Sequence, residues 1–141
     1  MARTRVETRA RARALQALYA WDMRGNGSGQ LERVATQVWD DLSITPDERR
    51  IAGPIVRVIA SQSRALDEQL ADVTTNWRLE RIGAVERCVL RMAAAELKIG
   101  ETPPRVVIQE SVTLAERFGS AQSAKFVNGV LDALARRMGR M

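Results

Sequence analysis

The chain has 141 residues, of which 45% are hydrophobic and 28% charged, and its formal net charge is +5. This length suffices for one domain with a hydrophobic core, so we treat residues 1–141 as a single domain. There is no histidine, which removes the commonest general base and metal ligand, and the single cysteine excludes an internal disulfide. We therefore expect neither enzymatic activity nor a metal or cofactor.

No apolar stretch is long enough to cross a bilayer, and the arginine-rich start lacks the apolar run of a signal peptide. We therefore expect a cytoplasmic protein without membrane contact. The charge is uneven: residues 1–13 carry +4 and residues 136–141 carry +3, which leaves −2 for the middle. A positive surplus at both ends is typical of a protein that binds a polyanion, although a solvated helix face produces the same pattern.

The first predicted helix has an apolar stripe at helical spacing, formed by Val6, Ala10, Ala14, Leu18 and Trp21. Arg5, Arg9 and Arg13 gather on one side of this stripe, and a glycine-rich run over 25–29 ends the helix. Like charges four residues apart destabilise a helix. We therefore describe residues 1–9 as a basic arm and expect residues 1–8 to be frayed in the free protein.

A second helix is predicted over 31–42, and the third begins with a strong start signal. Thr45 is placed as N-cap, Pro46 as first helical residue and Glu48 as the partner that closes a capping box. Gly53-Pro54 lies inside the third helix, so a kink or an early break is expected there.

After Trp77, apolar spacing predicts one or two helices that end at Gly100. Cys88 lies on their apolar stripe, so we expect it to be buried and unreactive. A further helix begins near Thr102-Pro103 and ends at Gly119, and a last helix follows. No segment alternates long enough to form a strand, so the fold class is all-α, with about seven helices.

The entrance of the last helix carries a possible nucleic-acid signature. Phe118-Gly119 ends one helix, and Lys125-Phe126 lies in the first turns of the next. Phe126 lies about 90° from the centre of the apolar stripe, at the rim of the core. A cation beside an aromatic ring can meet an anionic, stacking ligand, although plain packing explains Phe126 equally well.

These residues resemble the NusB family of bacterial transcription antitermination factors. The similarity runs from about Arg9 to Leu134 and is most specific in its later part. The matching segments are Arg9-Ala10-Arg11, Ala14 to Tyr19, Leu66-Asp67, Trp77, Arg81, Val85-Glu86-Arg87, Leu90-Arg91, Glu96-Leu97, Pro103 to Glu110, Leu114-Ala115, Phe118-Gly119, Ser123 and Lys125 to Asp132.

The resemblance implies a non-enzymatic protein built from two packed three-helix subdomains. Its expected partners are single-stranded boxA RNA, the small-subunit ribosomal protein NusE and the RNA polymerase antitermination complex. The RNA-binding positions that the resemblance and the residue chemistry indicate are Arg5, Arg9, Arg11, Arg13, Tyr19, Gln122, Ser123, Lys125 and Phe126. The partner-binding positions that it indicates are Tyr19, Glu80, Arg81 and Glu86. We expect a monomer or a weak homodimer.

The chain departs from the family pattern at a few positions. Gln122 stands where an acidic residue is frequent, Gln109 where asparagine is frequent, and Ala124 where histidine is frequent. An amide at position 122 can still hydrogen-bond a base edge. Two other interpretations stay open: a NusB-like RNA-binding module of an RNA cytosine methyltransferase, and a helical protein-interaction adaptor that binds no RNA.

Overall fold

A computed structural model of the protein describes residues 5–25, 30–74 and 78–141. Within these ranges the chain forms six α-helices and one 3-10 turn, and no strand. The elements are α1 (Arg5–Met23), α2 (Leu31–Leu42), α3 (Pro46–Val73), η1 (Leu79–Arg81), α4 (Ala84–Ile99), α5 (Pro104–Phe118) and α6 (Ala121–Arg137). The predicted all-α class is confirmed, and the described residues form six α-helices where about seven helices were expected.

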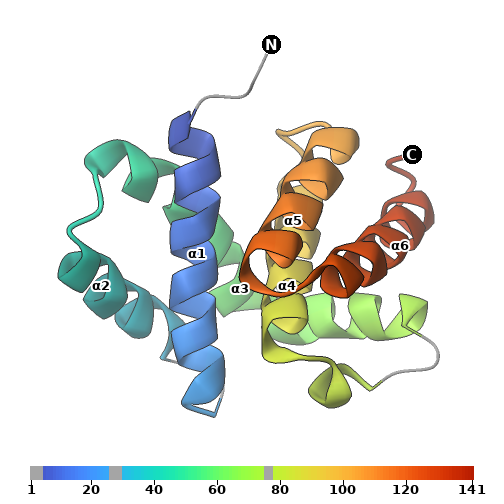
Figure 1. The fold of residues 1–141 in the computed structure, drawn as a ribbon, viewed down its shortest axis with the longest axis horizontal. Helices are drawn as coiled ribbons and strands as arrows, with labels where there is room; N and C mark the ends of the chain where they lie inside the picture. Colours follow the sequence, from blue (N-terminus) through green and yellow to red (C-terminus); the bar gives the residue numbers. More distant parts are fainter. Residues whose placement is uncertain (1–4, 26–29, 75–77) are drawn as a thin grey trace.

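The helices form two groups of three, as the resemblance implied (Figure 1). In one group α1 packs against α2 and the first part of α3, and in the other α4 packs against α5 and α6. The groups meet where α1 and α3 contact α4, and the last part of α3 reaches α6. In Figure 1, α1 runs downward and α4 runs upward, so the end of α1 lies beside the start of α4. None of the described helices is long and apolar enough to span a membrane.

The predicted start of α3 is confirmed in detail. The Thr45 side chain accepts a hydrogen bond from the Glu48 backbone N–H at 3.1 Å, and the Glu48 carboxylate accepts one from the Thr45 N–H at 2.9 Å. Pro46 occupies the first helical position, where its missing N–H is not needed. This reciprocal capping satisfies two backbone donors, so the local sequence alone is enough to begin the helix here.

The kink predicted at Gly53-Pro54 is found further along the chain instead. Pro54 lies inside α3, and the backbone leaves helical dihedral angles at Gln62, with φ −130° and ψ 23°. Ile59 before this bend and Leu66 after it are both fully buried. A bend at Gln62 lets both halves of α3 reach the core, so tertiary packing rather than proline decided its position.

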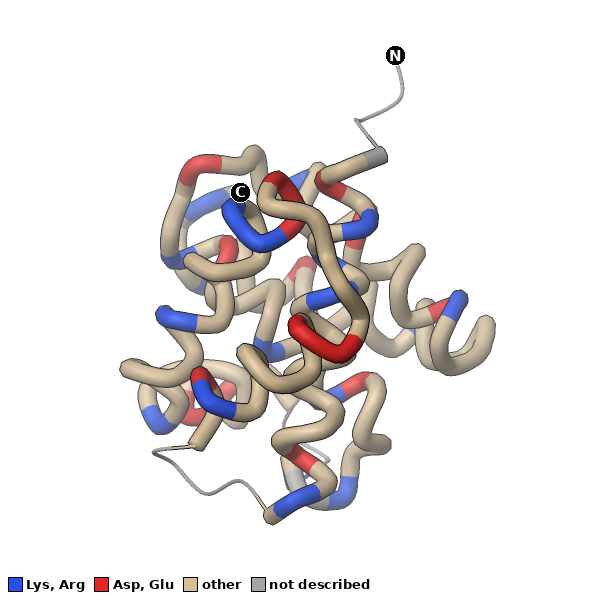
Figure 2. Tube along the Cα trace, turned by 90° about the vertical axis from the view of Figure 1, so that its left-hand side faces the viewer, with Lys and Arg blue, Asp and Glu red and all other residues tan. Residues whose placement is uncertain are grey.

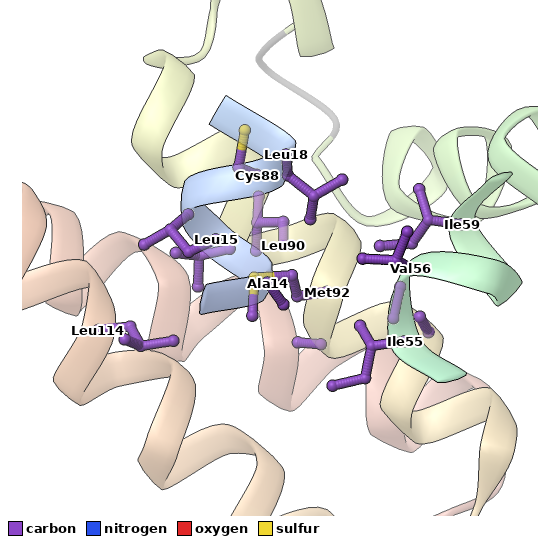
Figure 3. Close-up of a cluster of buried hydrophobic side chains, with 14 of the residues drawn as sticks. Ala14, Leu15, Leu18, Ile55, Val56, Ile59, Cys88, Leu90, Met92 and Leu114 are labelled. Atoms are coloured by element: carbon purple, nitrogen blue, oxygen red, sulfur yellow. The ribbon is translucent and has the colours of Figure 1, made fainter. Parts of the chain in front are cut away.

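One hydrophobic cluster joins all six α-helices. Figure 3 shows part of it, where Leu15 and Leu18 of α1, Ile55 and Ile59 of α3, and Leu114 of α5 surround residues of α4. Cys88 lies in this cluster as predicted, and burial raises the pKa of its thiol to about 12, which disfavours the reactive thiolate. Trp21 and Trp39 are buried, whereas Trp77 lies outside the described residues.

Arg11, which we predicted to bind RNA, lies in the interior with an exposed fraction of 4%. Its Nε and Nη2 donate to the two carboxylate oxygens of Glu96, at 2.7 and 2.9 Å, and its Nη1 donates to Glu110 at 3.4 Å. The guanidinium is thus bound within the protein and ties α1 to α4 and α5. The structure does not favour the predicted RNA contact of Arg11, because a bond to phosphate would require exchange of these buried partners.

The basic arm predicted over 1–9 overlaps the start of α1. Residues 5–9 are the first turns of α1, and the Thr8 hydroxyl donates to Glu110 at 3.2 Å. The fraying expected for residues 1–8 without RNA stays a prediction, which amide exchange with and without RNA would test. Residues 1–4 lie outside the described part of the chain.

Replacement of Arg11 by methionine should destabilise the fold by about 3–5 kcal/mol, because it leaves the Glu96 carboxylate buried without its partner. The double variant Arg11→Met/Glu96→Leu should recover much of this loss, since it removes both desolvated charges. Urea unfolding followed by circular dichroism measures both effects. A single variant as stable as the wild type would show that the ion pair contributes nothing.

Stability should also depend on pH through Glu48. A backbone hydrogen bond from Thr45 lowers the pKa of Glu48, burial opposes this, and a hydrogen bond from Arg9 adds to the lowering. The charged carboxylate therefore stabilises the fold above its unfolded-state pKa of about 4.3, and this contribution disappears as the pH falls through the lower folded-state pKa.

The measurement is the free energy of unfolding of wild type and Glu48→Gln between about pH 2 and pH 7. The two proteins should differ most near neutral pH and converge in acid. Parallel curves over the whole range would contradict this assignment.

Candidate nucleic-acid and protein interface

Two of the predicted RNA-binding arginines lie one helical turn apart on α1 and share an acidic partner. Arg9 Nε donates to one oxygen of Glu48 at 2.8 Å, and Arg13 Nε lies 3.7 Å from the other oxygen. The Glu48 side chain is only 3% exposed, whereas 49% of the Arg9 side chain and 27% of the Arg13 side chain are exposed. Glu48 therefore lies beneath the two arginines and reduces their mutual repulsion.

This arrangement leaves Arg9 able to bind an anion. A guanidinium has five N–H donors, and the bond to Glu48 uses the one on Nε. Since half of the side chain is exposed, its outer edge can donate to a phosphate. Arg13 is less exposed and also donates to Gln16 at 3.3 Å, so it is the weaker candidate of the two. The side chain of Arg5 lies outside what the structure describes.

The second group of predicted residues converges on one pocket of about 270 Å³. The turn before α4 and the start of α6 form its walls. Its lining is Arg81, Ile82, Gly83, Glu86, Ser120, Gln122, Ser123 and Phe126. Three RNA candidates (Gln122, Ser123, Phe126) therefore lie beside two partner candidates (Arg81, Glu86), although about 40 residues of chain separate the two sets.

A hydrogen-bonded chain joins the two walls of this pocket. The Ser120 side chain caps α6 by accepting from the Ser123 N–H at 3.1 Å, and the Ser123 hydroxyl donates to the Glu86 carboxylate. Ser123 is buried, with an exposed fraction of 5%. The structure thus shows its hydroxyl bonded within the protein, so a hydrogen bond donated by Ser123 to RNA requires exchange of this partner.

The remaining candidates differ in exposure. Gln122 and Lys125 are exposed, and Phe126 is partly buried against the core, at the rim where its spacing placed it. Tyr19 is 43% exposed on α1. Arg81 is exposed, whereas the side chain of Glu80 lies outside the described part.

The predicted residues therefore occupy two regions rather than one. Arg9 and Arg13 lie in the first half of α1, whereas Tyr19 lies near its end, three residues before Asp22, which pairs with Arg87 of α4. At 1.5 Å per residue, Arg9 and Tyr19 are about 15 Å apart along α1. A single strand of several nucleotides can extend over such a distance.

Basic and acidic residues are interspersed along the described part of the chain. Figure 2 shows basic and acidic positions mixed along the helices rather than separated into different parts of the trace. Three arginines, Arg11, Arg87 and Arg91, are paired with carboxylates inside the protein. A polyanion would meet exposed cations that are interspersed with acidic residues.

The sequence did not indicate four residues that shape these regions. Glu48 was expected only as a cap, and Glu96, Ser120 and Arg87 were given no role. Helical spacing shows which face of a helix a residue occupies, but not which residue of another helix lies opposite. An acidic residue on an apolar stripe, such as Glu96 beside Ala93 and Leu97, was the one available signal of a buried ion pair.

Comparison with known proteins gives consistent matches over most of the chain. Residues 8–136 match the model of the NusB family. The Transcription antitermination protein NusB of Anaeromyxobacter dehalogenans is 44% identical over 131 residues, which cover 91% of this chain and 89% of that protein. The protein of the same name from Sorangium cellulosum is 41% identical over 132 residues, covering 93% and 92% of the two chains.

Solved structures match in the same way. T. maritima NusB superimposes with a TM-score of 0.81 at 28% identity, over 96% of this chain and 93% of that one. A crystal structure of the antitermination factors NusB and NusE in complex with dsRNA matches with a TM-score of 0.84 at 28% identity, over 96% and 99%. From its sequence and its fold, this chain belongs to the NusB family.

Proposed function

We propose that this protein is a transcription antitermination factor that binds boxA RNA of nascent transcripts, notably ribosomal RNA, together with NusE. In this role it helps RNA polymerase resist termination and acts by binding, without catalysis, in the cytoplasm. The observation that carries the proposal is the pocket in which RNA candidates of α6 lie beside partner candidates at the start of α4. The similarity to a NusB that was solved with NusE and dsRNA supports the same assignment.

The RNA-binding part of the proposal rests on exposed cations and one aromatic ring. Arg9, Arg13 and Lys125 supply charge for phosphates, and Phe126 supplies a stacking edge at the rim of the pocket. Gln122 offers an amide for a base edge. Arg5 and Tyr19 remain proposed contacts, whereas Arg11 is left out because it is buried.

The partner-binding part rests on Glu86, Arg81 and Tyr19, with Glu80 carried over from the resemblance. Glu86 lies in the first turn of α4 and lines the pocket, and Arg81 lies on the turn before it. Tyr19 lies one turn before Asp22, whose carboxylate pairs with Arg87, the neighbour of Glu86. NusE would therefore meet both α1 and α4, with this protein as a monomer or a weak homodimer.

The antitermination role is favoured over the two alternatives by the comparisons. The curated relatives that match most of this chain are antitermination proteins, and their matched regions cover about nine tenths of their own length. An RNA cytosine methyltransferase module remains a weaker candidate, since no observation here favours it. A helical adaptor without RNA would leave the exposed Arg9 and Lys125 without a ligand.

RNA binding should be mainly electrostatic, with one stacking contact. The affinity for a boxA single strand should fall by roughly 0.7 log units per log unit of salt for each phosphate contact. The variant Arg9→Gln/Lys125→Gln should reduce this slope. Phe126→Ala should lose about 1–3 kcal/mol of binding free energy if the ring stacks on a base. Fluorescence anisotropy over a salt series measures both effects.

Two control variants separate binding from folding. Phe126→Leu keeps an apolar side chain against the core and removes the ring, so it should lose RNA affinity while the unfolding transition stays close to that of wild type. Arg33→Gln neutralises an exposed arginine of α2, outside the proposed surface, and should leave the salt slope unchanged. If the boxA affinity changes neither with salt concentration nor with removal of the Arg9 and Lys125 charges, the proposed RNA surface is refuted.

Partner binding should depend more on Glu86 than RNA binding does. Glu86→Lys reverses the charge at the pocket wall and removes the acceptor of the Ser123 hydroxyl, so it should weaken NusE binding more than direct boxA binding. Ser123→Ala removes the same internal hydrogen bond but keeps the carboxylate, so it is the control for NusE binding only, because Ser123 is itself an RNA candidate. Isothermal titration with each ligand gives the comparison, and equal loss of both affinities would count against separate RNA and NusE contacts.

A further inference from the structure

A buried carboxylate lies at the end of α1, where helix electrostatics does not favour one. The Asp22 side chain is only 1% exposed and occupies the last turn of α1, at the negative end of the helix dipole. It accepts from Arg87 through both oxygens, with Nε at 3.1 Å, and from Arg91 Nη1, also at 3.1 Å. Burial raises the pKa of Asp22, but these bonds outweigh burial and hold the pKa below its ordinary value.

Arg87 also binds the turn that precedes α4, through its second terminal nitrogen. Its Nη1 donates to the backbone carbonyl of Ile82 and, at 3.4 Å, to that of Leu79. These carbonyls belong to the 3-10 turn and the residue after it. One planar guanidinium therefore binds Asp22 with one edge and the turn with the other, which fixes the distance between α1 and the turn.

We propose that Asp22 and Arg87 are positioning residues for the turn over residues 79–83. This turn carries Arg81 and supplies Arg81, Ile82 and Gly83 to the pocket wall. Asp22 acts on the turn through Arg87, which binds both the Asp22 carboxylate and the carbonyl of Ile82. The part of the inference that concerns NusE rests on the proposed function, whereas the positioning of the turn does not.

Asp67 provides a comparison of the same chemistry. It accepts from Arg91 at 3.0 and 3.1 Å, in the same two-oxygen geometry with which Asp22 receives Arg87. Arg91 also donates to Asp22, and its guanidinium carbon lies 5.6 Å from the centre of the buried Trp21 ring. These partners of Arg91 belong to the core and not to the turn. Loss of the Asp67 carboxylate should therefore affect stability without release of the turn.

Hydrogen exchange of the full-length protein tests the positioning directly. The amides to follow are those of Arg81 and Ile82, which donate to Arg78 and Leu79 at 2.9 and 3.2 Å. In Asp22→Asn they should exchange about tenfold faster than in wild type, the scale expected when a charge-assisted hydrogen bond is lost. In Asp67→Asn they should exchange at the wild-type rate.

Arg87→Lys is the second variant, and it covers the case in which Asp22→Asn fails to fold. A lysine keeps a positive charge for Asp22 but cannot bridge to the two carbonyls, so the turn amides should again exchange about tenfold faster. Unchanged exchange at Arg81 and Ile82 in a folded Asp22→Asn or Arg87→Lys would overturn the proposal, as would equal acceleration in Asp67→Asn.

NusE titration tests the functional consequence. Asp22→Asn and Arg87→Lys should weaken NusE binding about tenfold while Asp67→Asn leaves it near the wild-type value. If Asp22→Asn, Arg87→Lys and Asp67→Asn bind NusE equally well although the turn amides exchange faster in the first two, the role of the turn in partner binding is overturned. Failure of the wild-type protein to bind NusE would refute the proposed function, and the exchange rates would still decide whether Asp22 and Arg87 position the turn.

Discussion

The structure depends on buried ion pairs that join α1 to α4 near both ends of their contact. Arg11 pairs with Glu96 at one end, and Asp22 pairs with Arg87 and Arg91 at the other. Because α1 and α4 belong to different groups of three helices, these pairs fix how the groups sit together (Figure 1). Removing one member would leave a charge buried without its partner, so the register of the two helices is strongly specified.

This constraint also explains how the chain uses its many arginines. A guanidinium can satisfy several acceptors at once, and Arg11, Arg87 and Arg91 each bind more than one partner within the protein. Such arginines do not add to a surface that attracts RNA. Arg9 and Lys125 are among the cations that remain exposed, and such cations occur on all six described α-helices.

Much of the local structure followed from the sequence. The Thr45 capping box, the burial of Cys88 and the rim position of Phe126 depend on spacing within one helix or on a few adjacent residues, and all three were predicted. The pocket residues of α4 and α6 came from the resemblance to the NusB family. Their convergence in one pocket was not derivable from spacing, because the two segments are far apart in the chain.

The sequence by itself determined the helices, their caps and the face that each one buries, because these depend on interactions between residues at most a few positions apart. Only the tertiary structure decided which charges face solvent. Arg9 and Arg11 are two residues apart and were both predicted to bind RNA, yet one is half exposed and the other is enclosed by Glu96 and Glu110. The bend at Gln62 was decided in the same way, since α3 must fit two groups of helices at once.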